Sequence, residues 1–450
     1  MRIKHVAIIG GGFSGALQAV NLLRHNGPRA TLIERRPTTA RGVAYSAAHA
    51  DHLLNVRAGN MSALPDDPGH FARWLARHRP DIGAGFAPRL VYGDYLSNLL
   101  EEAREAAPAR LSVLHDDAID LIVRDDAIEI CLASGGRIGA DAAILAVGNL
   151  PPHVPPGIDP DLLGLERFAA DPWAGDWGEG LGPDETVVVI GSGLTMIDVV
   201  LALDARGFCG KIVAMSRRGL LPRVHADVVP APPLPERPRP TSVGLLRHVR
   251  ARTEAVGWRA AVDALRPFTQ DLWIGAEPAE RRRFLRHLRA WWDVHRHRIA
   301  PSIADRIAAL QAEGRLEILA GKLIAAEPAG DGVRVRYRPR GTDAVAAIEA
   351  RRIVNATGPQ GDLTRGRDPL LRAMLARKLI RPDAMKVGID VTVQSEAIDA
   401  GGKPQPRLLA IGPMTRGTFW EIVAVPDIRR QTWSVARRLS NAHWVGGEGL

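Results

Sequence analysis

The stretch HVAIIGGGFSGALQAV at His5–Val20 decides the fold of this chain. It runs from a short β-branched segment through closely spaced glycines into an apolar helix start. A strand, a tight turn and a helix N-terminus in that order can hold a pyrophosphate. A second stretch of the same design, TVVVIGSGLTMIDV, occupies Thr186–Val199. Since one such turn binds one dinucleotide, two turns predict two dinucleotides.

Length and composition fit this interpretation. The chain has 450 residues, of which 46% are hydrophobic and 24% charged, so it can bury a sizeable core over two or three domains. No apolar run reaches the length of a membrane span. Its two cysteines, Cys131 and Cys209, form no CxxC pair, which indicates a reducing cytoplasm. The net charge of +9 could suggest nucleic acid, but the arginines are scattered or lie on helices, so we expect no nucleic-acid partner.

Strand-like and helix-like segments alternate along the chain, which predicts an α/β fold with two Rossmann-like dinucleotide-binding domains. We expect an FAD-binding domain split between residues 1–155 and 355–450. An NAD(P)H-binding domain is expected at 156–354, with a helical insertion at about 235–315.

The first glycine turn has the full G-x-G-x-x-G spacing, through Gly10, Gly12 and Gly15. The first glycine permits the turn, the second lets phosphate approach and the third lets the helix pack on the strand. Glu34 ends the next strand, where a carboxylate can accept ribose hydroxyls.

The second turn matches at Gly191 and Gly193 but has Met196 at the third position, which governs packing rather than phosphate approach. The following strand ends in Ser216, Arg217 and Arg218. Arginines there accommodate a 2′-phosphate, which favours NADPH over NADH; the alternative is that they are two solvated charges.

These stretches resemble the two-dinucleotide flavoprotein superfamily, and more closely the bacterial FAD/NAD(P)-binding proteins within it, which are similar to flavin-containing monooxygenases. The matching segments span nearly the whole chain: GGGFSG, GVAYS, HLLNVRAGNMSALP, YGDYL, VGNLPP, IGSGLTMIDVVLAL, SRRGLLPRVH, NATGP and GPMTRGTFWEIVAVPDIRRQ. Two patterns differ. Phe168 lacks the glycine and histidine of the F-x-G-x-x-x-H stretch of Baeyer–Villiger and N-hydroxylating flavoenzymes, and the missing CxxC disfavours a disulfide reductase.

The resemblance implies FAD in the first site, NADPH in the second, and a C-terminal segment close to the isoalloxazine. The predicted cofactor site comprises Gly10, Gly12, Phe13, Ser14, Gly15, Glu34, Arg35, Asn55, Gly148, Gly191, Ser192, Gly193, Leu194, Thr195, Ser216, Arg217, Arg218, Thr357, Gly358, Gly412, Trp420, Glu421 and Ile422.

Two of these residues are also candidates for a part in the reaction. Glu421 could position substrate or tune the flavin, or act as a helix-dipole partner. Asn55 could hydrogen-bond the flavin or nicotinamide, or cap a loop. His295–Arg298 could form a substrate lid, but an amphipathic helix with buried tryptophans and solvated arginines is favoured. No histidine has further ligands at metal spacing, so no metal is expected.

The resemblance implies an FAD-dependent oxidation driven by NADPH, with monooxygenation of a small molecule by O₂ through a C4a-(hydro)peroxyflavin favoured. An NADPH-dependent reductase or oxidase without oxygen transfer, and a flavin-binding redox sensor without turnover, remain alternatives. The oligomeric state stays open, with a homodimer among the options.

Overall fold

The computed structural model describes residues 3–46, 49–227 and 232–440. Its strands form three sheets. Two are built around a glycine turn, and the third is a small antiparallel sheet of β4 (Ala118–Val123), β5 (Ile128–Leu132) and β6 (Arg137–Ala140). The expected α/β fold with two Rossmann-like units is confirmed.

The first sheet has the strand order β15-β16-β7-β1-β2-β3. Its members are β1 (His5–Ile9), β2 (Arg29–Glu34), β3 (Leu111–His115), β7 (Ala142–Leu145), β15 (Glu396–Ile398) and β16 (Pro404–Ala410). All neighbours are parallel except β15 and β16. The central strand β1 is nearly all apolar and buried, as a parallel strand covered on both faces requires.

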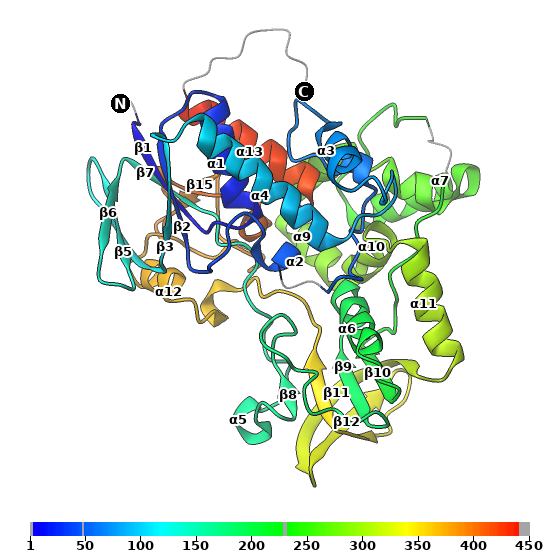
Figure 1. Cartoon of the computed structure of the whole chain (residues 1–450). Coiled ribbons are helices and arrows are strands. Elements are labelled where there is room, and N and C mark those ends of the chain that lie inside the picture. The colour runs from blue at the N-terminus through cyan, green and yellow to red at the C-terminus, as the bar shows by residue number, and fades with distance from the viewer. Residues whose placement is uncertain (1–2, 47–48, 228–231, 441–450) are drawn as a thin grey trace.

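Three helices lie together along this sheet, α1 (Phe13–Arg24), α4 (Arg89–Ala106) and α13 (Val425–Leu439) (Figure 1). The remaining helices outside the second unit are α2 (Gly42–Ser46), η1 (Ala58–Asn60), α3 (His70–His78), η4 (Leu363–Arg365), α12 (Pro369–Ala376) and η5 (Pro413–Thr415). Helix α1 starts directly after the first glycine turn, so this turn lies at the carboxyl edge of the sheet, where open α/β sheets bind ligands.

The second sheet has the order β13-β12-β11-β10-β9-β14-β8. It consists of β8 (Phe168–Ala169), β9 (Thr186–Ile190), β10 (Lys211–Ser216), β11 (Leu316–Ala329), β12 (Gly332–Pro339), β13 (Ala346–Ala350) and β14 (Arg352–Asn355). Helix α6 (Leu194–Ala205) follows the second glycine turn, and α5 (Pro160–Leu163) precedes the sheet. Strands β8, β14, β9, β10 and β11 run parallel, and β12 and β13 extend the sheet as antiparallel strands.

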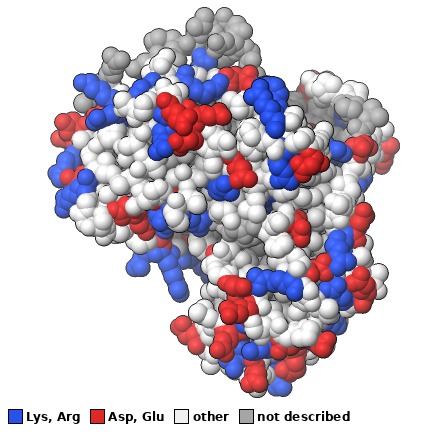
Figure 2. All heavy atoms as spheres, in the orientation of Figure 1, with Lys and Arg blue, Asp and Glu red and all other residues white. Residues whose placement is uncertain are grey.

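Between β10 and β11 the chain forms the helical insertion, drawn in green at the right of Figure 1. It contains α7 (Ser242–Asp263), η2 (Arg266–Phe268), α8 (Thr269–Ile274), α9 (Pro278–Arg283), the π-helical turn η3 (Phe284–Leu288), α10 (Arg289–Arg296) and α11 (Pro301–Ala312). None of the helices in the described ranges is long and apolar enough to cross a membrane. On the face shown in Figure 2, positive and negative side chains are interspersed.

Candidate functional site

The first glycine turn is constrained by its own backbone. Gly10 has φ of +102°, and a Cβ there would collide with the carbonyl oxygen of Ala146 at the end of β7. A Cβ on Gly15 would collide with the carbonyl oxygen of Gly10, so the third glycine lets α1 pack onto β1. Gly12 is the N-cap of α1 and has no side chain to cap it. The first N–H groups of α1 are therefore available to a phosphate.

Glu34 is held in place at the end of β2. One carboxylate oxygen accepts the N–H of Gly11 at 2.7 Å, and the other accepts the N–H of Arg36 at 2.9 Å. The side chain is buried yet lines the cavity described below. Because each carboxylate oxygen accepts more than one hydrogen bond, the fixed carboxylate can still bind ribose hydroxyls.

The second turn repeats this geometry at its first two positions. Gly191 has φ of +125°, and its Cβ would collide with the carbonyl oxygen of Ala356 after β14. Gly193 is the uncapped N-terminus of α6, and nothing lies within 4 Å of where its Cβ would be. At the third position Met196 is fully buried in the core of the second unit. This turn is open for a ligand, while its helix packs through a large side chain.

The three residues after β10 have separate surroundings. Ser216 Oγ accepts the N–H of Gly219 at 3.0 Å and lies 2.7 Å from Ser192 Oγ, so it shapes the loop. Arg218 packs over the ring of Trp291 at 5.8 Å. Arg217 is exposed and has no ion pair or hydrogen bond of its side chain within the described residues. Of the two arginines, Arg217 is the one left free for a 2′-phosphate.

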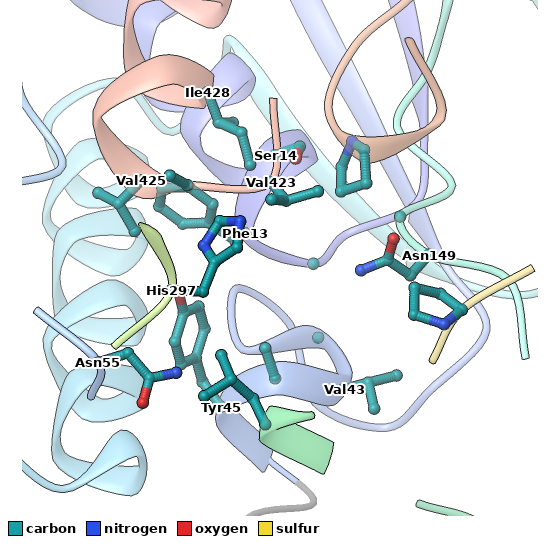
Figure 3. A pocket seen from close by; sticks show the side chains of 18 of the residues that line it. Phe13, Ser14, Val43, Tyr45, Asn55, Asn149, His297, Val423, Val425 and Ile428 are labelled. Atoms are coloured by element: carbon teal, nitrogen blue, oxygen red, sulfur yellow. The ribbon is translucent and has the colours of Figure 1, made fainter. Parts of the chain in front are cut away.

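One cavity of about 1250 Å³ runs between the two units and the insertion. Of the predicted site residues, eleven line it: Gly10, Gly12, Phe13, Ser14, Glu34, Arg35, Asn55, Gly148, Leu194, Thr195 and Gly358. Figure 3 shows Phe13, Tyr45, Asn55, Val425 and His297 around one part of it. Burial raises the pKa of the Tyr45 hydroxyl to about 12, so this hydroxyl is uncharged at physiological pH.

The other predicted residues lie outside the cavity wall: Gly15, Gly191, Ser192, Gly193, Ser216, Arg217, Arg218, Thr357, Gly412, Trp420, Glu421 and Ile422. Some of them support it from behind. Gly412, with φ of +77°, lies against Ser14 and donates its N–H to Gln431 at 2.7 Å. Thr357 hydrogen-bonds Asn355, whose side chain also holds the carbonyl groups of His153 and Ala170.

Trp420 and Ile422 differ from the expectation that they lie at a helix start beside the flavin. Trp420 stacks on Trp273 of the insertion, with ring centroids 4.5 Å apart, and Ile422 is buried in the first core. Helix α13 begins later, at Val425, and the residues that reach the cavity are Val423–Pro426 and Ile428. The predicted segment is therefore close to the cavity, but the residues facing it are the ones that follow.

Glu421 also differs from both roles expected for it. It is only 6% exposed, has φ of +66°, and precedes the first turn of α13. Its carboxylate accepts the indole N–H of Trp292 at 2.6 Å and Nε of Arg296 at 3.0 Å. Glu421 thus links α10 of the insertion to the segment before α13. It neither faces the cavity nor acts as a helix-dipole partner.

The favoured interpretation of His295–Arg298, with solvated arginines, is wrong. Arg298 is 4% exposed and pairs with Asp263, and Arg296 pairs with Glu421. His297 lines the cavity and keeps 30% of its side chain exposed, with Nε2 3.9 Å from Glu421. Burial lowers the pKa of His297, although Glu421 and Asp293 act in the opposite direction. A largely neutral imidazole therefore faces the cavity.

Asn55 lines the cavity. Its backbone carbonyl accepts a hydrogen bond from His225 at 2.9 Å, while its side-chain amide has no partner within the described residues (Figure 3). An amide with free donors and acceptor can bind a polar group placed in the cavity.

Sequence reasoning missed the contacts that join the two units. Asp198 of α6 is 5% exposed and makes a bidentate pair with Arg89 of α4, at 2.8 and 3.0 Å. His52 Nε2 also donates to the backbone carbonyl of Asp198 at 2.9 Å. An aspartate within the apolar run LTMIDVVLAL was the available signal, because a buried charge needs a partner.

Comparisons with known proteins agree with this architecture. Residues 7–150 match the model of a family described as FAD-NAD(P)-binding. No curated protein sequence matches the chain.

Solved structures that match include the ornithine hydroxylase of Pseudomonas aeruginosa, at 13% identity and a TM-score of 0.66, covering 98% of this chain and 99% of that one. L-lysine 6-monooxygenase from Pseudomonas syringae matches at 16% identity and a TM-score of 0.68, with 98% and 100% covered. Thioredoxin reductase from Lactococcus lactis matches at 12% and 0.55, with 98% and 99% covered. The chain therefore has the two-dinucleotide flavoprotein fold, with an FAD-NAD(P)-binding segment at residues 7–150.

Proposed function

We propose that this protein is an FAD-dependent oxidoreductase driven by NADPH, and that it is a monooxygenase of a small molecule. The observation that carries the proposal is the shared cavity, which both Glu34 of the first unit and Leu194 and Thr195 of the second line. At about 1250 Å³ it exceeds the roughly 300–1,000 Å³ of a typical single-ligand pocket. It therefore has room for a dinucleotide and a second ligand together.

The residues of the first unit fit FAD. The uncapped start of α1 offers N–H groups to a pyrophosphate, and the fixed carboxylate of Glu34 offers acceptors to a ribose. When bound, FAD would supply the transfer of electrons from NADPH to O₂. The domain division expected above assigns this role to residues 1–155 and 355–450, and we retain it as part of the proposal.

The second unit fits NADPH. Gly193 leaves open space at the start of α6, and the side chain of Arg217 has no ion pair or hydrogen bond in the part of the chain that the structure describes. Leu194 and Thr195 lie on the cavity wall, so a nucleotide at this turn would reach the cavity that Glu34 also lines. The ion pair of Arg89 and Asp198 joins α4 of the first unit to α6 of the second, so it would orient the two nucleotide sites relative to each other. Asn55 would offer its side-chain amide to a ligand in the cavity.

Two observations favour oxygen transfer over disulfide reduction. Cys131 and Cys209 are separate free cysteines, so the described residues hold no dithiol for reduction. Two of the similar structures described above are also named hydroxylase or monooxygenase.

Coupling between the substrates tests the proposal. NADPH oxidation, O₂ uptake and hydrogen peroxide release are measured on the purified flavoprotein with and without a panel of small molecules. A monooxygenase releases less peroxide per NADPH when its substrate is present and forms an oxygenated product with one water. Stoichiometric peroxide under every condition indicates an oxidase instead, and absence of NADPH turnover indicates a redox sensor.

A further inference from the structure

His225 is held in the wall of the cavity by contacts with three other segments. Its backbone N–H donates to the carbonyl oxygen of Ile299 at 2.9 Å, and its ring packs on Phe86 with the centroids 5.2 Å apart. Its ring nitrogen Nε2 lies 2.9 Å from the backbone carbonyl oxygen of Asn55. These contacts fix the orientation of the imidazole and join the loop after β10 to the segment that carries Asn55.

The contact with Asn55 also determines which ring nitrogen of His225 carries the proton. A carbonyl oxygen only accepts hydrogen bonds, so Nε2 carries the proton and donates. In the neutral ring Nδ1 then has a free lone pair, and it has no hydrogen bond within the described residues. Burial lowers the pKa of His225, so this acceptor stays unprotonated at physiological pH.

The charged groups around His225 are bound to other protein groups. They are paired as Arg298 with Asp263 at 2.9 Å, Arg57 with Asp227 at 2.6 Å, and Arg259 with the backbone carbonyl of Val224 at 3.0 Å. Burial is the main cause of the lowered pKa of His225; Arg298 and Arg57 add to it, whereas Asp263 and the bond to Asn55 oppose it. In the described part of the chain none of these groups donates to Nδ1, which leaves this nitrogen for a ligand.

The segment that carries Asn55 is tied to the helix after the second glycine turn. Arg89 donates to the carbonyl oxygen of Leu53 at 3.1 Å and to the carboxylate of Asp198 at 2.8 and 3.0 Å. Asp198 lies one helical turn beyond the start of α6, whose first two residues line the cavity. A nucleotide that enters the cavity from this helix start would therefore pass close to Asn55 and His225.

A carboxamide matches the hydrogen-bonding groups that these two residues offer. Nδ1 of His225 needs an N–H or O–H donor, and the side-chain amide of Asn55 has a free donor for a carbonyl oxygen (Figure 3). A carboxylate or a fully ionised phosphate has no proton to donate to Nδ1. Nicotinamide carries a carboxamide on the ring that transfers hydride.

We propose that His225 and Asn55 bind the carboxamide of the nicotinamide of NADPH. The carboxamide N–H would donate to Nδ1 of His225, and the carboxamide oxygen would accept from Nδ2 of Asn55. This inference rests on the proposed function, because it assigns the nicotinamide end of the same nucleotide. The loop after β10 would then contact the nucleotide at both ends, through Arg217 at the 2′-phosphate and through His225 at the nicotinamide.

Calorimetric titration of the purified, FAD-loaded protein tests this contact without turnover. The probes are NADP⁺, its 3-acetylpyridine analogue, in which a methyl group replaces the carboxamide NH₂, and 2′,5′-ADP, which lacks the nicotinamide. Since the analogue loses one neutral hydrogen bond, we expect the wild-type protein to bind NADP⁺ roughly 2- to 10-fold more tightly than the analogue. This ratio should fall toward one in acid, because protonated Nδ1 no longer accepts.

His225→Gln keeps an N–H donor for the carbonyl of Asn55 but removes the acceptor at Nδ1. It should therefore reduce the ratio to near one and leave the affinity for 2′,5′-ADP unchanged. His225→Asn, which has an amide oxygen close to the position of Nδ1, should keep part of the preference. The matched control is His297→Gln, because this imidazole also lines the cavity and has a lowered pKa, but its Nε2 lies toward Glu421. It should leave the ratio unchanged.

Three results overturn the assignment. The wild-type protein binds NADP⁺ and the analogue equally, or His225→Gln keeps the preference, or His225→Gln weakens 2′,5′-ADP as much as NADP⁺, which shows a structural role. Failure of the proposed function shows separately, as a protein that holds no FAD or binds none of the three probes.

Discussion

The two glycine turns of this molecule have the same backbone geometry but carry different side chains around it. Gly10 and Gly191 both have strongly positive φ, and in both turns a Cβ would collide with a carbonyl oxygen after the neighbouring strand. The third position has Gly15 in one turn and the buried Met196 in the other. After the next strand, one turn has Glu34 and the other has Arg217. We propose that the shared geometry forms a phosphate site in each turn, and that the differences select the nucleotide that each turn holds.

The middle glycines offer the strongest way to break this comparison. Gly12→Val places a side chain against Gly42, 3.2 Å from the Cβ position, and in the path of a pyrophosphate, so we expect a protein without FAD. In Gly193→Val the added Cβ meets no protein atom within 4 Å, so we expect this variant to fold, keep its FAD and lose reduction by NADPH. Flavin absorbance and stopped-flow reduction measure the two effects.

The test lies in the contrast between the two variants, since one should lose FAD and the other should keep FAD but lose reduction by NADPH. A yellow, fully loaded Gly12→Val protein contradicts the first site. A Gly193→Val protein reduced by NADPH at the wild-type rate shows that the second turn is structural.

Variants of Arg217 and Arg218 sharpen the comparison, because we expect Arg217 to contact the nucleotide and Arg218 to contact Trp291. Arg217→Ala should lower the preference for NADPH over NADH by about one to two orders of magnitude, since a charge-assisted contact contributes about 1.5–3 kcal/mol. Arg218→Ala should lower it less, because this side chain packs on Trp291. KM values for both nucleotides measure the preference. Equal preference in both variants and the wild type would mean that both arginines are solvated charges.

The smallest expected effect is the pH dependence of stability at the joint between the units, which consists of His52, Arg89 and Asp198. Burial lowers the pKa of His52, which donates to Asp198, while its Nδ1 accepts the N–H of His49. As pH falls below about 6.5, the unfolded state takes up this proton before the folded state does, so stability is full above that pH and declines below it. The contribution of His52 is at most about 1.4 kcal/mol per pH unit.

His52→Gln keeps an N–H donor for Asp198 and should flatten this acid decline in urea unfolding curves. His5→Gln is the comparison variant: the pKa of His5 is also lowered by burial, so this variant should flatten the acid decline too, but its ring contacts Thr31 and Gly139 within the first unit. We also expect acid to slow flavin reduction by NADPH, and only His52→Gln should change this slowing, because of the two histidines only His52 contacts both units. An unchanged acid slope in His52→Gln would remove His52 from the joint.

The sequence was most informative where the backbone leaves few choices. A β-branched run followed by spaced glycines permits one local structure, so both units of the fold could be predicted from Gly10 and Gly191. Glu34 was predicted from its place at the end of the next strand, and it does lie against the first turn, where it accepts the N–H of Gly11. The third sheet was not predicted from the sequence.

Residues that depend on distant partners could not be predicted in this way. Glu421 turns away from the cavity because its backbone is left-handed and because Trp292 and Arg296 bind its carboxylate. Arg89 and Asp198 are far apart in the sequence and meet only when both units are folded.

The strand order of the first sheet has a consequence for folding during synthesis. Every strand of the second sheet comes from residues 168–355, whereas β16, which borders β7 inside the first sheet, comes from residues 404–410. On the ribosome the second unit can be completed while β7 pairs with β1 on one side and still lacks β16 on the other. We expect the nascent chain to acquire its nucleotide-binding unit first, and FAD to be retained only after β16 has been translated.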